Sequence, residues 1–208
     1  MELFEGHHSF VCGMTGTGKT TFVLNRLKAS RFPVFFFNFQ HIDTPFVKCS
    51  GDYGPSDIIE AVKQGDKIDF RPSKYKSFAR MQLNYIVNEF FAKDQFRNRP
   101  FYFVIDEAHE TVAQGDKNDY VLMIPTRGRA LGFMGIFLTQ RPALIDKTVI
   151  SQCTKHFIFY TEYEVNYFRT KGLDAQKITD MLGARPEDFH NYVIYERGQY
   201  TGPFKEKL

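Results

Sequence analysis

The feature that most constrains the fold is a change of residue type within residues 10–27, FVCGMTGTGKTTFVLNRL. An apolar run gives way to small residues that include three glycines, and the chain then resumes with a helix-like pattern. This order predicts a buried strand, a tight glycine-rich turn and a helix. Residues 13–20 also fit G-x-x-x-x-G-K-[ST] at each fixed position. Between a strand and a helix, that pattern indicates a phosphate-binding loop.

The residue types of this loop have physical reasons. Glycines let the backbone curl so that successive N–H groups point at one anion. The helix after Gly18 directs the positive end of its dipole at the same place. We expect Lys19 to reach the β- and γ-phosphates of ATP and Thr20 to bind Mg²⁺. The candidate nucleotide-binding residues are Gly13, Met14, Thr15, Gly16, Thr17, Gly18, Lys19, Thr20 and Thr21.

Strand-like and helix-like stretches alternate along the chain of 208 residues, without an internal repeat or a Pro/Gly/Ser-rich linker. A long amphipathic helix is expected over 73–96, where apolar residues recur at roughly helical spacing: Phe78, Met81, Leu83, Tyr85, Ile86 and Phe90. Strands are expected at 8–14, 33–39, 67–72, 101–105, 133–142 and 155–161, followed by a closing hairpin over 191–204.

This alternation predicts the fold class. Several of the strands are apolar nearly throughout, which is typical of strands buried on both faces of a parallel sheet. We therefore predict an α/β fold with a mostly parallel sheet, helices on both faces and a C-terminal β-hairpin. The whole chain, residues 1–208, is expected to be one domain. Sheets of this kind bind ligands at the carboxyl ends of their strands.

The composition excludes several classes of protein. Hydrophobic residues make up 43% of the chain, and the net charge of +3 argues against a histone-like nucleic-acid binder while permitting a local basic patch. No apolar run approaches the ~18–20 residues that span a bilayer, and no secretory signal is visible. The three cysteines are widely spaced, so we expect a reduced, intracellular protein without a disulfide framework. We expect His7 and His8 to be an ordinary exposed pair rather than metal ligands.

Two acids follow the strand expected at 101–105. Asp106, at a strand tip beside the phosphate loop, is expected to hold Mg²⁺, which is the Walker B role. Glu107 is placed to orient and deprotonate the attacking water. A small-molecule kinase does not need the second acid, because its substrate is the nucleophile, so the pair favours ATP hydrolysis. Glu110 is a weaker alternative for the base, and we expect His109 to be a neighbouring helix residue rather than part of a helicase signature.

The strand expected at 133–142 has a polar tip and is preceded by two arginines. Gln140 is placed to hydrogen-bond both the γ-phosphate and the attacking water, a sensor role. The alternative is that it only caps the strand. Arg127 and Arg129 are either ordinary surface charges or candidates for an arginine finger that reaches the nucleotide of a neighbouring subunit. Such a finger is worth ~10³–10⁵ in rate and, when it acts in trans, requires a ring.

Taken in order, the segments GMTGTGKTT, FYFVIDEAHE and TRGRALGFMGIFLTQRP resemble the FtsK–HerA superfamily of DNA-translocating ATPases. The last segment is the distinguishing one, because a basic, glycine-containing helix end leads into an apolar strand and then Thr-Gln-Arg-Pro. The resemblance covers about residues 10–150. Within the superfamily, the small size is most similar to the genome-packaging ATPases of icosahedral viruses with an internal membrane, of the archaeal turreted type.

This resemblance implies a RecA-like P-loop NTPase fold with ATP and Mg²⁺ as cofactors. It also implies a homo-oligomeric ring, of six subunits or alternatively five, around double-stranded DNA that is pumped into a preformed viral capsid. The membrane spans, winged-helix domain and N-terminal barrel of other members have no counterpart here. We therefore expect a bare motor that docks on capsid-vertex or membrane proteins, in the host cytoplasm or associated with the virion, and not secreted.

Two loops are candidates for DNA contact, residues 40–55 and 111–119. Lys48 and Lys117 are their only Lys or Arg residues, and Arg71, Lys74 and Lys76 follow the strand expected at 67–72. Contacts from such residues to phosphates would be independent of sequence and sensitive to salt. For each of them the alternative is a solvated loop residue.

Three other functions stay open at this point. A cellular or conjugative DNA-pumping ATPase of the same superfamily would carry the same motifs. A nucleoside or other small-molecule kinase fits the size and the phosphate loop, but leaves Glu107 and Gln140 without a purpose. A nucleotide-gated scaffold that ATP locks into a ring would need no turnover, and the intact set of base and sensor argues against it.

Overall fold

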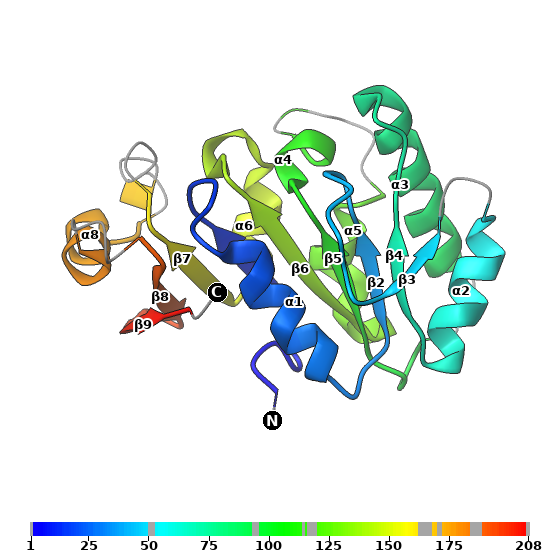
Figure 1. Cartoon of the computed structure of the whole chain (residues 1–208), viewed down its shortest axis with the longest axis horizontal. Coiled ribbons are helices and arrows are strands. Elements are labelled where there is room, and N and C mark those ends of the chain that lie inside the picture. The colour runs from blue at the N-terminus through cyan, green and yellow to red at the C-terminus, as the bar shows by residue number, and fades with distance from the viewer. Residues whose placement is uncertain are drawn as a thin grey trace.

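A computed structural model describes residues 2–49, 53–92, 96–113, 115, 120–161, 168–169, 172–183 and 189–206. Its strands form one sheet in the order β3-β4-β2-β5-β6-β1-β7-β8-β9 (Figure 1). The seven strands from β3 to β7 in this order, which include β1 and β2, pair in parallel. Strands β8 and β9 add an antiparallel hairpin at one edge. The predicted α/β fold with a C-terminal hairpin is confirmed.

The strands are β1 (Ser9–Cys12), β2 (Val34–Phe37), β3 (Val47–Cys49), β4 (Lys67–Phe70), β5 (Phe101–Ile105), β6 (Phe133–Thr139), β7 (Lys155–Phe159), β8 (Asn191–Glu196) and β9 (Gln199–Lys205). The helices are α1 (Lys19–Ala29), α2 (Pro55–Gln64), α3 (Lys76–Ala92), α4 (Ala108–Thr111), α5 (Met123–Arg127), α6 (Lys147–Gln152) and α8 (Ala175–Leu182). Two 3₁₀ turns, Gly128–Leu131 and Pro142–Leu144, flank β6.

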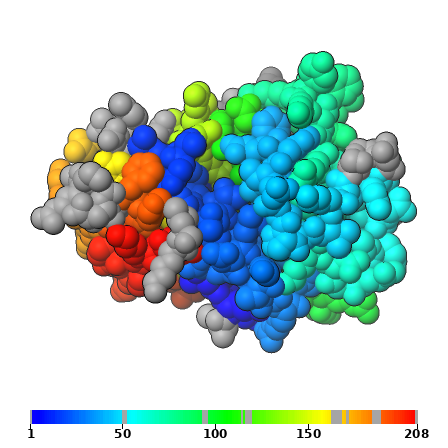
Figure 2. Space-filling view, in the orientation of Figure 1, coloured from blue at the N-terminus to red at the C-terminus, as the bar shows by residue number. Residues whose placement is uncertain are grey.

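Both faces of the sheet are buried, which explains the apolar strands. In β2, Phe35 and Phe37 pack in the core beneath α2, α3, α5, α6 and α8, whereas Val34 and Phe36 pack beneath α1. Because successive side chains of a strand point to opposite faces, this strand requires apolar residues at each position. Figure 2 shows the blue atoms of α1 crossing the middle of the molecule, between the red hairpin and the cyan atoms of α2.

The strand order places β6 between β1 and β5. Val11 of β1 pairs with Leu138 of β6, and Val104 of β5 pairs with Ile136 of β6. The carboxyl ends of these three strands therefore lie side by side, where the central parallel strands of the sheet end. The phosphate loop, the Asp-Glu pair and Gln140 follow these three ends in the sequence.

Three local expectations need correction. Strand β3 lies inside the segment 40–55 that was expected to be a loop; it is three residues long, and Val47 and Lys48 are exposed, so it lacks an apolar pattern. His8 is buried and accepts the backbone N–H of Gly135 at 2.9 Å, so it is not part of an exposed pair.

The third correction concerns α3, whose apolar residues divide between two faces. Leu83, Ile86 and Phe90 are buried in the core. Phe78, Met81 and Tyr85 are exposed by 57%, 65% and 57%. The helix therefore presents a second, exposed apolar surface.

No helix within the described ranges combines the length and the hydrophobicity that crossing a membrane requires.

Candidate nucleotide-binding and catalytic site

The phosphate loop joins β1 to α1, and its glycines are needed where they stand. Gly16 and Gly18 have positive φ angles of 81° and 93°, a conformation that favours glycine. A Cβ on Gly13 would lie 2.5 Å from the Cβ of Phe159, because the loop passes close to the end of β7. The Met14 N–H also donates to the Tyr160 carbonyl at 2.9 Å. The loop is thereby held against β7, which pairs with β1 on the side opposite β6.

Lys19 is the first residue of α1 and points back into the loop. Its side chain is buried, and its Nζ donates to the Met14 carbonyl at 2.7 Å. Burial lowers the pKa of Lys19, and the charges of Glu107 and Asp106 oppose that shift. Lys19 therefore lies within electrostatic reach of both acids. Thr20, partly buried, and Thr21, exposed, follow it on the helix.

Asp106 follows the last residue of β5 and is only 3% exposed. Burial, and then the neighbouring charge of Glu107, raise the pKa of Asp106 to about 7, although its carboxylate accepts the backbone N–H groups of Glu107 and Gln40. Its Oδ2 atom is buried and has no hydrogen-bond partner among the described residues. An unpaired buried carboxylate oxygen is costly, and carboxylate and hydroxyl oxygens are ligands that Mg²⁺ accepts. The unpaired oxygen of Asp106 therefore fits a ligand of a magnesium ion.

Glu107 has a strained backbone and a side chain held by several groups. Its φ of 46° and ψ of 50° are left-handed, which is uncommon for a residue other than glycine. The Gln40 side-chain amide donates to its Oε1 atom, and the backbone N–H of Gln140 also donates to its carboxylate. Burial raises the pKa of Glu107, while Lys19 opposes the shift. A raised pKa makes the carboxylate a better proton acceptor when it is ionised.

Gln140 lies directly after β6, between the phosphate loop and the acids. Its Oε1 atom accepts a hydrogen bond from the Thr15 hydroxyl of the loop. Its backbone N–H donates to the Glu107 carboxylate. Gln140 thus links both halves of the site and does more than cap its strand.

His109 and Glu110 form a chain of polar contacts behind Glu107. The buried His109 has its Nδ1 atom 3.2 Å from Glu107 Oε2 and 3.0 Å from the Thr139 hydroxyl, and its Nε2 atom 3.2 Å from Glu110 Oε1. Glu110 also pairs with Lys76 of α3 at 2.6 Å. Burial raises the pKa of Glu110, but the hydrogen bond and charge of Lys76 outweigh it and the net shift is downward. Glu110 is therefore a poorer base than Glu107.

Arg127 and Arg129 lie at the amino ends of the parallel strands, opposite the site. Arg127 ends α5 and Arg129 lies in the following 3₁₀ turn, both before β6 begins, whereas the site lies after β6 ends. Seven residues of β6 at ~3.3 Å each separate them from Gln140. The charge of Arg129 instead lowers the pKa of His7 and His8, which precede β1, although burial is the larger cause. Neither arginine joins the site within one chain.

Sequence reasoning missed Gln40 and gave too little weight to His109 and Arg141. Gln40 follows β2, which pairs with β5, so the rule that sites gather at carboxyl ends of strands could have found it. Arg141 follows Gln140, and its charge lowers the pKa of Glu107, after the larger effects of burial, Lys19, the Gln140 N–H and Glu110. Lys117 and most of residues 111–119 lie outside the described residues.

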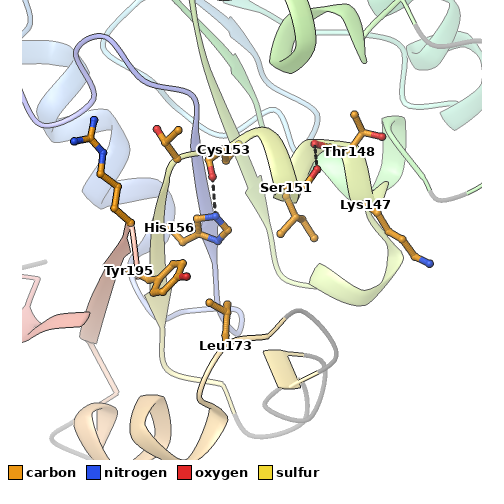
Figure 3. Close-up of a pocket in the computed structure, with 10 residues that line it drawn as sticks. Lys147, Thr148, Ser151, Cys153, His156, Leu173 and Tyr195 are labelled. Carbon is orange, nitrogen blue, oxygen red and sulfur yellow. Dashed lines mark hydrogen bonds between the residues drawn. The ribbon is translucent and has the colours of Figure 1, made fainter. Parts of the chain in front are cut away.

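A separate cavity of about 520 Å³ lies beside β7, between α6 and the hairpin (Figure 3). His156 lies against it and bonds the Cys153 carbonyl at 2.9 Å, and Lys147 and Arg197 line its rim. These residues do not touch the phosphate loop or the acids. We assign this cavity no part in nucleotide binding.

No protein-family model matches the sequence, and no curated protein matches it. Solved structures match the fold closely. The genome packaging NTPase B204 from Sulfolobus turreted icosahedral virus 2, in complex with AMPPCP, superimposes with a TM-score of 0.66 over 96% of this chain and 98% of that one, at 15% identity. The chain has the P-loop NTPase fold.

Two further P-loop proteins support this assignment. The DNA-packaging ATPase B204 from Sulfolobus Turreted Icosahedral Virus gives a TM-score of 0.64, with 96% and 98% of the two chains covered, at 16% identity. EssC (ATPases 2 and 3) from Geobacillus thermodenitrificans gives 0.57 at 13% identity, covering 95% of this chain and 39% of that one. At such identities the likeness concerns the P-loop fold alone.

Proposed function

We propose that the protein is an ATP-hydrolysing motor that moves double-stranded DNA and packages a viral genome into a preformed capsid. One observation carries the proposal. The phosphate loop, two buried acids and Gln140 converge at one edge of a sheet whose fold matches a genome-packaging NTPase from end to end.

The site residues have distinct proposed roles in hydrolysis. Lys19 exchanges the Met14 carbonyl for the β- and γ-phosphates of ATP. Thr20 and Asp106 would hold Mg²⁺, which would neutralise charge that develops on the phosphates. Glu107 accepts the proton of the attacking water, and Gln140 exchanges Thr15 for the γ-phosphate. The strain at Glu107 fits this role, because strained backbone conformations cluster at functional sites.

The position of the two arginines supports a ring. Neither Arg127 nor Arg129 is at the site of its own chain, so a finger from either must reach the nucleotide of a neighbour. A closed homo-oligomeric ring, of six copies or alternatively five, supplies such a neighbour at each site. Double-stranded DNA would pass through the channel of this ring.

Four of the basic residues named for DNA contact are described. They lie towards the carboxyl ends of the strands, as the ATP site does. Lys48 pairs in register with Asp69, and Arg71 follows β4. Lys74 is exposed, and Lys76 begins α3 and reaches Glu110. Phosphate contacts at this edge would be close to the ATP site. Capsid-vertex or membrane proteins would dock the motor, in the host cytoplasm or on the virion.

A cellular or conjugative DNA pump with this fold would carry the same site, and the origin of the DNA distinguishes it from a packaging motor. A small-molecule kinase is disfavoured, because Glu107 is buried beside Asp106 and held by several donors, which a kinase does not require. Phosphoryl transfer to a nucleoside without DNA would favour the kinase.

The test is the ATPase rate per subunit against protein concentration, with and without a DNA duplex. A finger that acts in trans predicts that the specific activity rises as the ring assembles, and that duplex DNA raises it further. A rate that is independent of concentration and indifferent to DNA would contradict the proposal.

A further inference from the structure

The cavity beside β7 has no part in the ATP site, yet its walls have the features of a binding site. Its volume of about 520 Å³ is in the range of cavities that hold ligands. His156, on its wall, is the second residue of β7 and pairs in register with Phe10 of β1. The cavity therefore lies towards the amino ends of the strands, away from the phosphate loop, and a ligand in it would not compete with ATP.

His156 offers this cavity a fixed hydrogen-bond acceptor. The residue is 7% exposed, and its Nε2 atom donates to the Cys153 carbonyl at 2.9 Å. Burial lowers the pKa of His156, so the ring is neutral at pH 7 and Nδ1 keeps its lone pair. Among the described residues, Nδ1 has no hydrogen-bond partner. Ring contacts with Phe10 at 5.7 Å and Tyr195 at 5.6 Å hold the imidazole in place, so this acceptor is ready for a donor from a ligand.

The floor of the cavity is apolar. Ile150, Cys153 and Leu173 line it, and all three are buried. Figure 3 shows Leu173 and Tyr195 beside the ring of His156. An apolar side chain of a ligand fits this floor, because burial of apolar surface is favourable. A sugar or a phosphate would lose hydrogen bonds with water there without replacement.

Lys147 and Arg197 give the rim of the cavity a positive charge. Lys147 begins α6 and Arg197 lies in the turn of the hairpin, so a cation stands on each of the two sides. No carboxylate is found among the described residues that line the cavity. In the part of the chain that the structure describes, neither cation has an ion-pair partner. The rim therefore attracts an anion.

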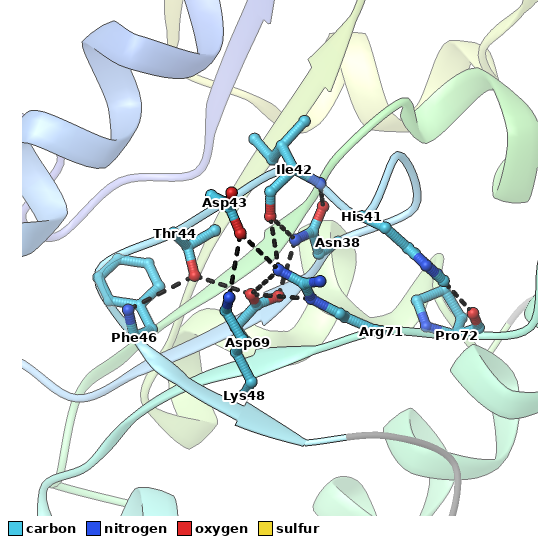
Figure 4. Close-up of polar contacts among 10 residues, drawn as sticks. All are labelled: Asn38, His41, Ile42, Asp43, Thr44, Phe46, Lys48, Asp69, Arg71 and Pro72. Carbon is cyan, nitrogen blue, oxygen red and sulfur yellow. Dashed lines mark hydrogen bonds and ion pairs between the residues drawn. The ribbon is translucent and has the colours of Figure 1, made fainter.

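Several other cations at the surface are paired within the chain. Lys48 and Arg71 contact Asp43 at 3.0 and 3.4 Å, and Arg71 also contacts the buried Asp69 at 3.4 Å (Figure 4). Arg31 contacts Glu5 at 2.6 Å. The charges of Lys147 and Arg197 differ from these, because they stay available to an anion from outside the chain.

The turn that carries Arg197 does not explain the arginine. Arg197 and Gly198 have positive φ angles of 49° and 83° and lie between the paired residues Glu196 and Gln199. Two-residue hairpin turns with this geometry favour Asn or Asp before Gly. An arginine at that position costs the turn some stability and adds a planar group whose parallel donors suit a carboxylate.

We infer that the cavity binds a peptide segment of a partner protein that presents a carboxylate next to a large apolar side chain. The carboxylate contacts Arg197 and Lys147, the apolar side chain lies against Leu173, and a peptide N–H donates to Nδ1 of His156. A peptide carries these three groups on neighbouring atoms, whereas a nucleic-acid backbone offers no apolar side chain for the floor. The carboxylate is either the C-terminal one or that of an acidic side chain. The cavity is separate from the ATP site, so this inference does not depend on the proposed function.

The test uses dye-labelled pentapeptides that begin Gly-Ser-Gly and carry each pair of amino acids at the last two positions. One set ends in a free carboxylate and the other in an amide, and fluorescence anisotropy measures the affinity of wild type for each peptide. Peptides with a large apolar residue beside a carboxylate should bind best. Amidated peptides without Asp or Glu should bind about tenfold more weakly, the factor that one hydrogen bond to a charged group supplies. Amidated peptides that contain Asp or Glu show whether a side-chain carboxylate serves as well.

Arg197→Gln should lose about tenfold in affinity for the peptide that binds best, and Arg197→Lys should lose less because it keeps the charge. Arg31→Gln is the matched control, since it removes the same charge from an exposed arginine that does not line the cavity. It should bind the peptide as wild type does. The thermal unfolding of each variant checks that the fold is intact.

A second readout places the peptide inside the cavity. The imidazole nitrogens of His156 are followed by NMR while the peptide is added to wild type. The Nδ1 signal should shift, because this nitrogen accepts the peptide N–H, and the Nε2 signal should change less, because it stays bonded to the Cys153 carbonyl.

Three results would each overturn the inference. They are equal affinity for the acid set and for amidated peptides without Asp or Glu, unchanged affinity in Arg197→Gln, and an Nδ1 signal that does not respond to the peptide. A shift of Nδ1 with inorganic phosphate alone, and none with any peptide, would assign the cavity to phosphate instead.

Discussion

His109 Nδ1 lies 3.2 Å from the carboxylate of Glu107, and the ring is buried between that carboxylate and Glu110. Thr139 at the end of β6 touches the same nitrogen at 3.0 Å. The imidazole thus ties the proposed base to the strand that carries Gln140. We regard His109 as a positioning residue that acts through Glu107.

His109→Ala should lower kcat about tenfold and leave the affinity for ATP unchanged, because it removes the polar contact at 3.2 Å that orients the base. His109→Asn should recover much of the rate, since its amide can donate from the position of Nδ1. Steady-state kinetics and nucleotide titration measure both quantities. Equal losses in kcat and ATP affinity, without recovery in His109→Asn, would mean that the ring only supports the fold.

Glu107→Gln should bind ATP normally and lose turnover by about 10²–10⁴, the usual contribution of a general base. Glu110→Gln is the comparison, because Glu110 is engaged by Lys76 and should not take the proton. Its loss should be tenfold or less. Normal hydrolysis in Glu107→Gln would refute the assignment, and a larger loss in Glu110→Gln would move the role to Glu110.

Local sequence signals were enough to predict much of this fold. The glycines and apolar residues of 10–27 act within a few residues, so β1, the glycine-rich turn and α1 were predicted correctly. The hairpin of β8 and β9 turns at Arg197 and Gly198, which have φ angles of 49° and 83°, and its signals are equally local. Strand β3 was missed because it is short and exposed at the edge of the sheet.

The contacts of Gln40 and His109 depend on the order of strands. Gln40 meets Glu107 because β2 pairs with β5, and His109 meets Thr139 because β5 pairs with β6. No residue pattern within either segment encodes its neighbour in the sheet. The sequence therefore predicted the acids and Gln140 at their strand ends but missed Gln40, and it could not predict which of these residues touch.

Arg127→Ala and Arg129→Ala test the finger in trans. The variant that removes the acting arginine should bind ATP and lose about 10³ in rate, and the other variant serves as its control. Mixing the inactive variant with Glu107→Gln should restore activity, because mixed interfaces combine an intact site with an intact arginine. Full activity in both single variants, or no recovery on mixing, would contradict a trans finger.

His8 predicts how stability depends on pH. Burial lowers the pKa of His8 to about 4 in the folded state, against ~6.5 in the unfolded chain. The unfolded state then binds more protons between these values, so stability falls as the pH drops from 6.5 towards 4. His8→Asn keeps an acceptor for Gly135 and does not titrate there. Between pH 7 and 4.5, wild type should lose about 2 kcal/mol more in the free energy of urea unfolding than His8→Asn; parallel losses would show that His8 does not cause the effect.

The most direct test of the motor is displacement of a third DNA strand from a duplex by the assembled wild-type ring. A protein that moves along double-stranded DNA should strip the third strand only when ATP and Mg²⁺ are present, and Glu107→Gln should bind the same DNA without stripping it. If the wild-type ring hydrolyses ATP on this DNA at full rate and the third strand stays bound, hydrolysis is not coupled to movement and the central claim is contradicted.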